Sequence, residues 1–150
     1  REVMQVFTPG DHGSTFGGSP IAAAVGLAAL ETLIDERLVE RAAALGAHLL
    51  DRLSSIRNLL IREVRGRGLF AGVELHRNMA SAGAVVGRLL QAGVLTKDTH
   101  RNTIRFAPPL IIDQSQVDWA VDRFTEVLDE VAAAHVRVPG SVASSEPQST

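Results

Sequence analysis

The centre of the chain reads Ile61-Arg62-Glu63-Val64-Arg65, then Gly66-Arg67-Gly68, then Leu69-Phe70-Ala71-Gly72-Val73-Glu74-Leu75. The two outer runs contain the β-branched and aromatic residues that favour strands, and the link between them is short and glycine-rich. A single Arg-Gly repeat between two strands is better explained as a turn than as an RNA-binding repeat. The stretch therefore predicts a β-hairpin.

Helical periodicity on both sides of this hairpin predicts four helices. Ser19 followed by Pro20 marks the start of the first helix, because serine caps helices and proline fits the first helical position. Asp113 with Gln116 resembles a capping box and opens the last helix. The expected elements besides the hairpin are helices over 21–34, 37–56, 81–92 and from 113 to about 131, and strands over 94–96 and 103–106.

This order of elements is typical of an α+β domain with a small mixed or antiparallel sheet and helices on one face. The 150 residues suit one domain or slightly more, and a hydrophobic fraction of 45% is ordinary for a globular protein. The formal net charge of -2 lacks the basic footprint of a nucleic-acid or membrane-surface binder. There is no cysteine and no apolar run of the ~20 residues that a membrane helix needs, so we expect a cytoplasmic protein without nucleic-acid or membrane partners.

A loop rich in small residues, Gly13-Ser14-Thr15-Phe16-Gly17-Gly18, precedes the first predicted helix. Glycines let several backbone N–H groups converge, and the helix N-terminus adds partial positive charge. The hydroxyl groups of Ser14 and Thr15 add further hydrogen-bond donors. Such a loop suits a phosphate or a carboxylate; the simpler alternative is a glycine-rich turn that leads into a capped helix.

Arg105 lies between two apolar residues of the predicted strand 103–106, so alternation directs its side chain to the opposite face of the sheet. A planar guanidinium there could grip a substrate carboxylate with two hydrogen bonds; the alternative is an exposed arginine on an edge strand. The histidines lack metal-ligand spacing, and no metal site is predicted. Lys97 is the only lysine, and a structural or substrate-proximal role is favoured over a nucleophilic one.

Three stretches resemble those of the class-III, fold-type-I pyridoxal-phosphate aminotransferases. Residues 7–20 resemble the family signature GxHGSTxGGNP, and residues 64–74 resemble the hairpin of its small domain. Residues 93–110, which include the run Lys97-Asp98-Thr99-His100, are similar to the ornithine aminotransferases within that family. The resemblance covers residues 3 to about 132 in unbroken order.

This resemblance implies the C-terminal part of such an enzyme. Residues 1–35 would be the end of the large domain and the interdomain helix, residues 36–137 the small C-terminal α+β domain, and residues 138–150 a disordered tail. The chain departs from the signature at Phe16, where the family commonly has tyrosine, and at Ser19, where it has asparagine. The first change removes one hydroxyl group, whereas serine can still cap a helix.

The resemblance also implies roles for individual residues. Thr15 would hydrogen-bond the phosphate of pyridoxal 5'-phosphate in the partner subunit, Ser14 would lie beside both cofactor and substrate, and Arg105 would bind the substrate α-carboxylate. The family's cofactor-binding lysine, the aspartate that pairs with the pyridine nitrogen and the ring-stacking aromatic residue lie upstream, and they have no counterpart here. We therefore expect no catalytic residue in this chain and no transamination by the chain alone.

The implied reaction moves the δ-amino group of ornithine to 2-oxoglutarate, giving glutamate 5-semialdehyde and glutamate, within arginine and proline metabolism. The expected partner is a large-domain chain, or an upstream half, that carries the cofactor lysine, in a homodimer or a split heteromer. Two alternatives stay open. The chain could be a non-catalytic relic or interaction fragment, or it could belong to an enzyme of the same class that acts on acetylornithine or 4-aminobutyrate.

Overall fold

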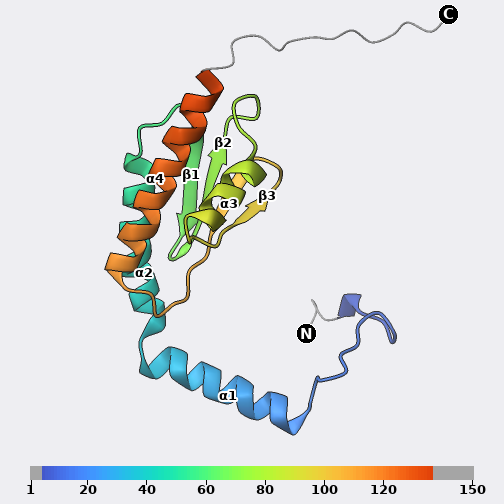
Figure 1. Cartoon of the computed structure of the whole chain (residues 1–150). Coiled ribbons are helices and arrows are strands. Elements are labelled where there is room, and N and C mark those ends of the chain that lie inside the picture. Colours follow the sequence, from blue (N-terminus) through green and yellow to red (C-terminus); the bar gives the residue numbers. More distant parts are fainter. Residues whose placement is uncertain (1–4, 137–150) are drawn as a thin grey trace, which may run out of the picture. The chain divides into compact units, whose positions relative to one another are not determined.

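The computed structural model describes residues 5–136, which divide into two compact units, one that ends at Val39 and one that begins at Glu40 (Figure 1). The predicted domain boundary after residue 35 falls in the short link between helices α1 (Pro20–Asp35) and α2 (Leu38–Ser55). The predicted tail, 138–150, lies outside the described residues.

The first unit consists of the glycine-rich loop and α1. The helix begins as predicted, with Ser19 as the N-cap residue in an extended conformation and Pro20 in the first turn, although the Ser19 side chain makes no capping hydrogen bond. None of the residues of α1 is buried. A helix that is apolar on all sides is normally covered by other parts of a protein, and the exposed apolar side chains of α1 are Ile21, Val25, Leu27, Leu30 and Ile34.

The second unit is built on a four-stranded sheet. Its strands are β1 (Ile61–Arg67), β2 (Phe70–Leu75), β3 (Lys97–Thr99) and β4 (Thr103–Phe106). They lie in the order β1-β2-β4-β3, and every neighbouring pair is antiparallel. The predicted α+β fold is confirmed, with the sheet antiparallel rather than mixed.

The central hairpin is tighter than the sequence suggested. Gly66 and Arg67 belong to β1, and Arg67 pairs with Phe70, so only Gly68 and Leu69 form the turn. Gly68 has a φ of 55°, which glycine adopts without steric cost. α2 approaches this turn closely, because a Cβ atom added to Gly46 would lie 2.1 Å from the carbonyl carbon of Gly68.

The core lies between one face of the sheet and helices α2, α3 (Ala82–Gln91) and α4 (Gln114–Val136) (Figure 1). Its largest fully buried side chain is Phe124 of α4, whose ring meets that of Phe106 edge to face at 5.1 Å between centroids. The helical periodicity that predicted α2 and α4 is confirmed, because each helix buries apolar residues on the side that meets the sheet. In α3, Leu89 is fully buried, whereas its neighbour Leu90 is exposed.

The strand predicted over 94–96 is wrong, because the strand begins three residues later, at Lys97. The N–H of Val94 donates to the carbonyl of Leu89, and that of Gly93, at a φ of 86°, donates to Leu90. These bonds close the end of α3 in the pattern of a Schellman motif. Because the N–H of Val94 is used in this cap, it is not available for pairing with a neighbouring strand.

Polar contacts fix the ends and the mutual position of the long helices. The capping box of α4 is confirmed: the Asp113 N–H donates to Oε1 of Gln116 at 3.1 Å, and the Gln116 N–H donates to Oδ1 of Asp113 at 2.8 Å. His48 of α2 contacts Asp118 of α4 at 2.7 Å, and Arg52 bonds the same carboxylate. The hydrogen bond from His48 lowers the pKa of Asp118 below its ordinary value.

Candidate functional site

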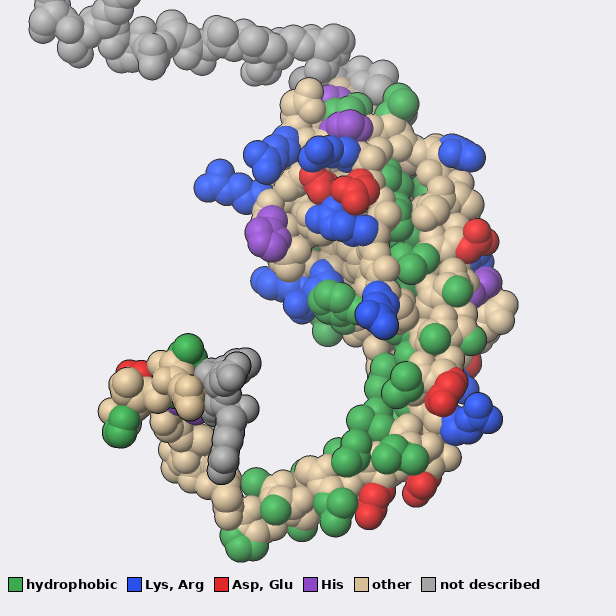
Figure 2. Space-filling model, turned by 180° about the vertical axis from the view of Figure 1, so that it is seen from behind, with side chains coloured by type: hydrophobic (Ala, Val, Ile, Leu, Met, Phe, Trp, Pro, Cys, Tyr) green, Lys and Arg blue, Asp and Glu red, His purple; other side chains and the backbone are tan. Residues whose placement is uncertain are grey.

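The face of the sheet that points away from the core carries charged side chains. Strand alternation places Ala71, Val73 and Leu75 of β2 in the core, and Phe70, Gly72 and Glu74 on the other face. The register then aligns neighbours on this open face: Gly72 lies between Arg65 and Arg105, and Arg105 lies opposite Lys97. Basic side chains gather on one face of this unit around a few acidic ones (Figure 2).

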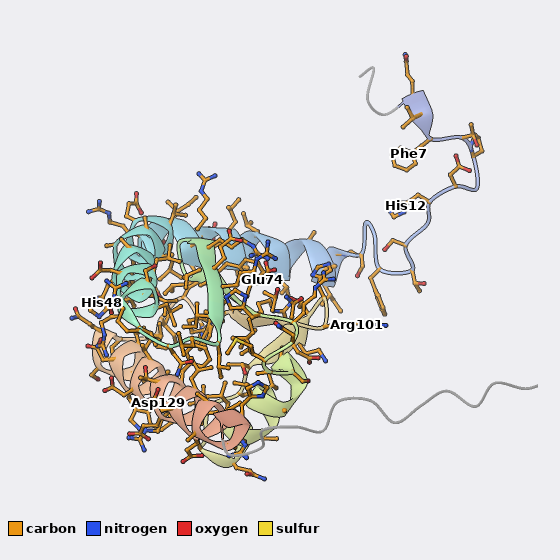
Figure 3. All side chains as sticks on the ribbon, turned by 90° about the horizontal axis from the view of Figure 1, so that it is seen from above. Phe7, His12, His48, Glu74, Arg101 and Asp129 are labelled. Carbon is orange, nitrogen blue, oxygen red and sulfur yellow. The ribbon has the colours of Figure 1, made fainter. Side chains whose placement is uncertain are left out.

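Glu74 is the centre of an ion-pair network at the β1–β2 side of the open face. Its carboxylate contacts Nη1 of Arg62 at 2.5 Å and Nη1 of Arg65 at 2.8 Å, and Asn102 donates to it at 3.3 Å. Arg65 also reaches Glu63 at 3.1 Å. Glu74 projects from the sheet on the side away from Asp129 of α4 (Figure 3). Its hydrogen bond with Arg65, followed by the charge of Arg62, lowers the pKa of Glu74.

Replacing Glu74 with glutamine is expected to reduce stability above pH ~4.3, the ordinary pKa of a glutamate. Because the folded state lowers this pKa, the Glu74 carboxylate stabilises the fold at neutral pH, and that contribution is lost as the pH falls through the folded value. Urea unfolding measured from pH 3 to 7 should therefore give a flatter profile for Glu74→Gln than for the wild type.

A matched control for this profile is Glu130→Gln, because Glu130 makes one exposed ion pair with Arg88 at 3.3 Å. Exposed pairs of this kind contribute little to stability. Equal profiles for the wild type and Glu74→Gln would show that the network around Glu74 is not maintained in solution.

Arg105 occupies the other side of the open face, on β4. Its guanidinium carbon lies 5.9 Å from the centroid of the Phe70 ring, within cation–π range. Among the described residues, no carboxylate lies within ion-pair distance of Arg105. The sequence prediction that Arg105 points away from Ile104 and Phe106 is confirmed, since both are buried and Arg105 is exposed. Its guanidinium is free to bind a carboxylate.

The glycine-rich loop is held by local hydrogen bonds and exposes its hydroxyl groups. The Thr8 N–H and hydroxyl donate to Asp11 at 2.7 and 2.9 Å, which lowers the pKa of Asp11. Ser14 Oγ accepts the N–H of Gly17 at 3.0 Å, so one predicted site residue shapes the loop. Thr15 is exposed. Phe7 and His12, which are labelled in Figure 3, belong to the same unit as this loop.

The predicted site residues thus fall in two units. Ser14 and Thr15 are adjacent in the first unit, and Arg105 lies in the second, with Lys97 and Phe70 as its neighbours. The proximity of Phe70 to Arg105 was not predicted, because it depends on the register of β2 against β4. Within residues 5–136, no three His, Asp or Glu side chains are grouped as a metal site would need, and no helix is long and apolar enough to span a membrane.

A family model described as aminotransferase class-III matches residues 1–128. The chain belongs to the class-III aminotransferases. Among its relatives, the ornithine aminotransferase of Staphylococcus carnosus is 53% identical over 126 residues, and those of Bacillus subtilis and Brevibacillus brevis are 51% and 48% identical over 128 residues. These alignments cover 84% to 85% of this chain and 31% of each relative, so the chain spans about a third of their length.

Solved structures of this class-III aminotransferase family share the fold. The ornithine δ-aminotransferase of Plasmodium falciparum superimposes with a TM-score of 0.80 at 35% identity, over 89% of this chain and 35% of that one. The acetylornithine aminotransferase of Elizabethkingia anophelis gives a TM-score of 0.74 at 39% identity, over 85% of this chain and 33% of that one. The family implies pyridoxal phosphate as cofactor.

The donor groups of this class-III chain fit part of a pyridoxal phosphate site. The exposed Thr15 hydroxyl, beside glycines that precede the N-terminus of α1, suits a phosphate oxygen. The only lysine, Lys97, lies on an edge strand of the other unit, with 68% of its side chain exposed. A lysine that forms a Schiff base with the cofactor is normally withdrawn from solvent, which Lys97 is not. Of the groups that a pyridoxal phosphate site needs, the described residues therefore offer donors that suit the phosphate and no lysine that suits the covalent bond.

Proposed function

We propose that this chain contributes the small domain, and the end of the large domain, to an ornithine aminotransferase. In this enzyme the δ-amino group of ornithine passes to 2-oxoglutarate, giving glutamate 5-semialdehyde and glutamate. When bound, pyridoxal phosphate supplies the electron sink that amino-group transfer requires. Thr15 donates to its phosphate in the partner subunit, Ser14 lies beside cofactor and substrate, and Arg105 binds the substrate α-carboxylate.

The observation that carries this proposal is Arg105 on the open face of the sheet. It is exposed on β4, its guanidinium carbon lies 5.9 Å from the centroid of the Phe70 ring, and no described carboxylate is paired with it. A planar guanidinium in this state offers two parallel N–H donors to a carboxylate. The identities of 48% to 53% with ornithine aminotransferases support ornithine as the amino donor.

The exposed apolar side chains of α1 support the need for further polypeptide. Five large apolar residues of this helix are more than half exposed, and none of its residues is buried. Apolar surface of this kind is stabilised when another protein surface covers it. The proposed cover is a large domain that carries the cofactor lysine, in a homodimer or a split heteromer. The cytoplasmic location stays a prediction.

The test is a chimera in which this chain replaces the matching C-terminal third of the Bacillus subtilis ornithine aminotransferase. We expect the purified chimera, supplied with pyridoxal phosphate, to convert ornithine and 2-oxoglutarate to glutamate. The 150-residue chain alone should show no activity. A folded chimera that binds the cofactor but does not transaminate ornithine would refute the proposal.

One specific observation favours acetylornithine as a second candidate substrate. The acetylornithine aminotransferase of Elizabethkingia anophelis shares the fold with a TM-score of 0.74. The same chimera should therefore be assayed with ornithine, acetylornithine and 4-aminobutyrate as alternative amino donors. A higher kcat/KM with acetylornithine than with ornithine would decide for the second candidate.

A further inference from the structure

Two cations stand opposite each other on the open face of the sheet. Lys97 of β3 pairs in register with Arg105 of β4, so both side chains leave the sheet on the same side. Both are exposed. Lys97 forms one ion pair, with Asp98 at 3.6 Å from Nζ, and Asp98 pairs in the sheet with Ile104, whose side chain is in the core.

The positive charges on the two halves of this face are compensated by acidic side chains to different extents. At the β1–β2 side, Arg62 and Arg65 are paired with Glu63 and Glu74. At the β4–β3 side, no described carboxylate stands between Arg105 and Lys97, and like charges directly opposite each other destabilise a sheet. Gly72 separates the two halves, since it places no side chain between Arg65 and Arg105. An anion bound at the second half would relieve this repulsion.

The surroundings of the two cations form a hollow that could hold such an anion. It has a volume of about 340 Å³ and is lined by Leu95, Thr96, Lys97, Arg105 and Ala107. The Thr96 hydroxyl is buried, and it has no hydrogen-bond partner within the described part of the chain. The Phe70 ring lies within cation–π range of the Arg105 guanidinium. Cationic groups and an unused hydroxyl beside one hollow indicate an anionic ligand.

We propose that Lys97 is a specificity-determining residue, which together with Arg105 favours the dicarboxylate oxo acid over the diamino acid. This inference rests on the proposed function, in which Arg105 binds the α-carboxylate. A dicarboxylate such as 2-oxoglutarate carries two negative charges at neutral pH, whereas ornithine carries two ammonium groups and one carboxylate. A second cation beside Arg105 attracts the first compound and repels the second.

The full 150-residue chain provides the direct test. Binding of 2-oxoglutarate and of ornithine is followed by NMR at the backbone amides of Lys97 and Arg105. We expect Lys97→Met to weaken 2-oxoglutarate binding about two- to fivefold, the range for an exposed ion pair, and to leave ornithine binding unchanged or stronger. Lys97→Arg should retain the preference. Arg67→Met, which removes a charge from the opposite edge of the same face, should have no effect.

The same variants in the chimera separate this inference from the proposed function. There Lys97→Met should raise KM for 2-oxoglutarate and not for ornithine. A chimera that transaminates, but whose two KM values are both unaffected or change equally, overturns the role of Lys97 and leaves the proposed function standing. A folded chimera that binds the cofactor but is inactive refutes the proposed function, and the preference in the isolated chain then decides the inference. A wild-type chain that binds neither compound, or both equally, overturns it.

Discussion

Replacing Gly46 with alanine is expected to destabilise the second unit by about 3 kcal/mol. The added Cβ atom would lie 2.1, 2.3 and 2.4 Å from the carbonyl carbon, carbonyl oxygen and Cα of Gly68. These are backbone atoms of the β1–β2 turn, which cannot rotate away as a flexible side chain can. Either α2 must shift from the hairpin, which pulls buried Leu49 and Leu53 out of register with the core, or the turn must deform.

A matched control for this substitution exists in α3. A Cβ atom added to Gly87 would meet nothing within 4 Å, so Gly87→Ala should increase stability by up to about 1 kcal/mol through helix propensity. Urea unfolding followed by circular dichroism measures both variants. If Gly46→Ala unfolds at the same denaturant concentration as the wild type, α2 does not pack on the Gly68 turn at this distance.

Local signals were sufficient where a residue's conformation depends on its near neighbours. Asp113 and Gln116 predicted the start of α4 because the capping box is formed within four residues. The periodicity of the apolar residues after Asp113 predicted the rest of α4, because residues three and four apart share one face of a helix. The direction of the Arg105 side chain followed from alternation in a strand whose neighbours Ile104 and Phe106 are apolar.

The edge strand β3 could not be predicted in this way. Val94 and Leu95 are apolar, and Val94 and Thr96 are β-branched, which favours a strand. The N–H of Val94 is used by the cap of α3, however, and the polar run Lys97–Thr99 forms the strand by pairing with β4. The turn after it contains His100 and Arg101 at φ values of 52° and 68°, where glycine would have been the recognisable signal. Lys97 lies opposite Arg105 because of this register between β3 and β4, so the pair could not be predicted from the sequence.

Replacing Arg105 with glutamine in the chimera is expected to lower kcat/KM for both substrates about a hundredfold, the scale of losing one partner from a desolvated carboxylate–guanidinium pair. Arg105→Lys should also lose activity, because an ammonium group cannot form two parallel hydrogen bonds with a carboxylate. Neither change should alter the free energy of unfolding by more than about 0.5 kcal/mol, since Arg105 is exposed and makes no ion pair with the described residues. Steady-state kinetics at several concentrations of each substrate, with urea unfolding alongside, measure both effects.

The matched control for Arg105 is Arg67→Gln, which removes a guanidinium from the same face at the other edge of the sheet. A similar loss of activity in both variants would show that the overall positive charge of the face attracts the substrate. Such long-range attraction depends on net charge and weakens with added salt. A loss confined to Arg105, and persisting at high ionic strength, requires direct contact with the substrate. Unchanged kcat/KM in Arg105→Gln would remove Arg105 from the substrate site, and with it the main structural support for the proposed function.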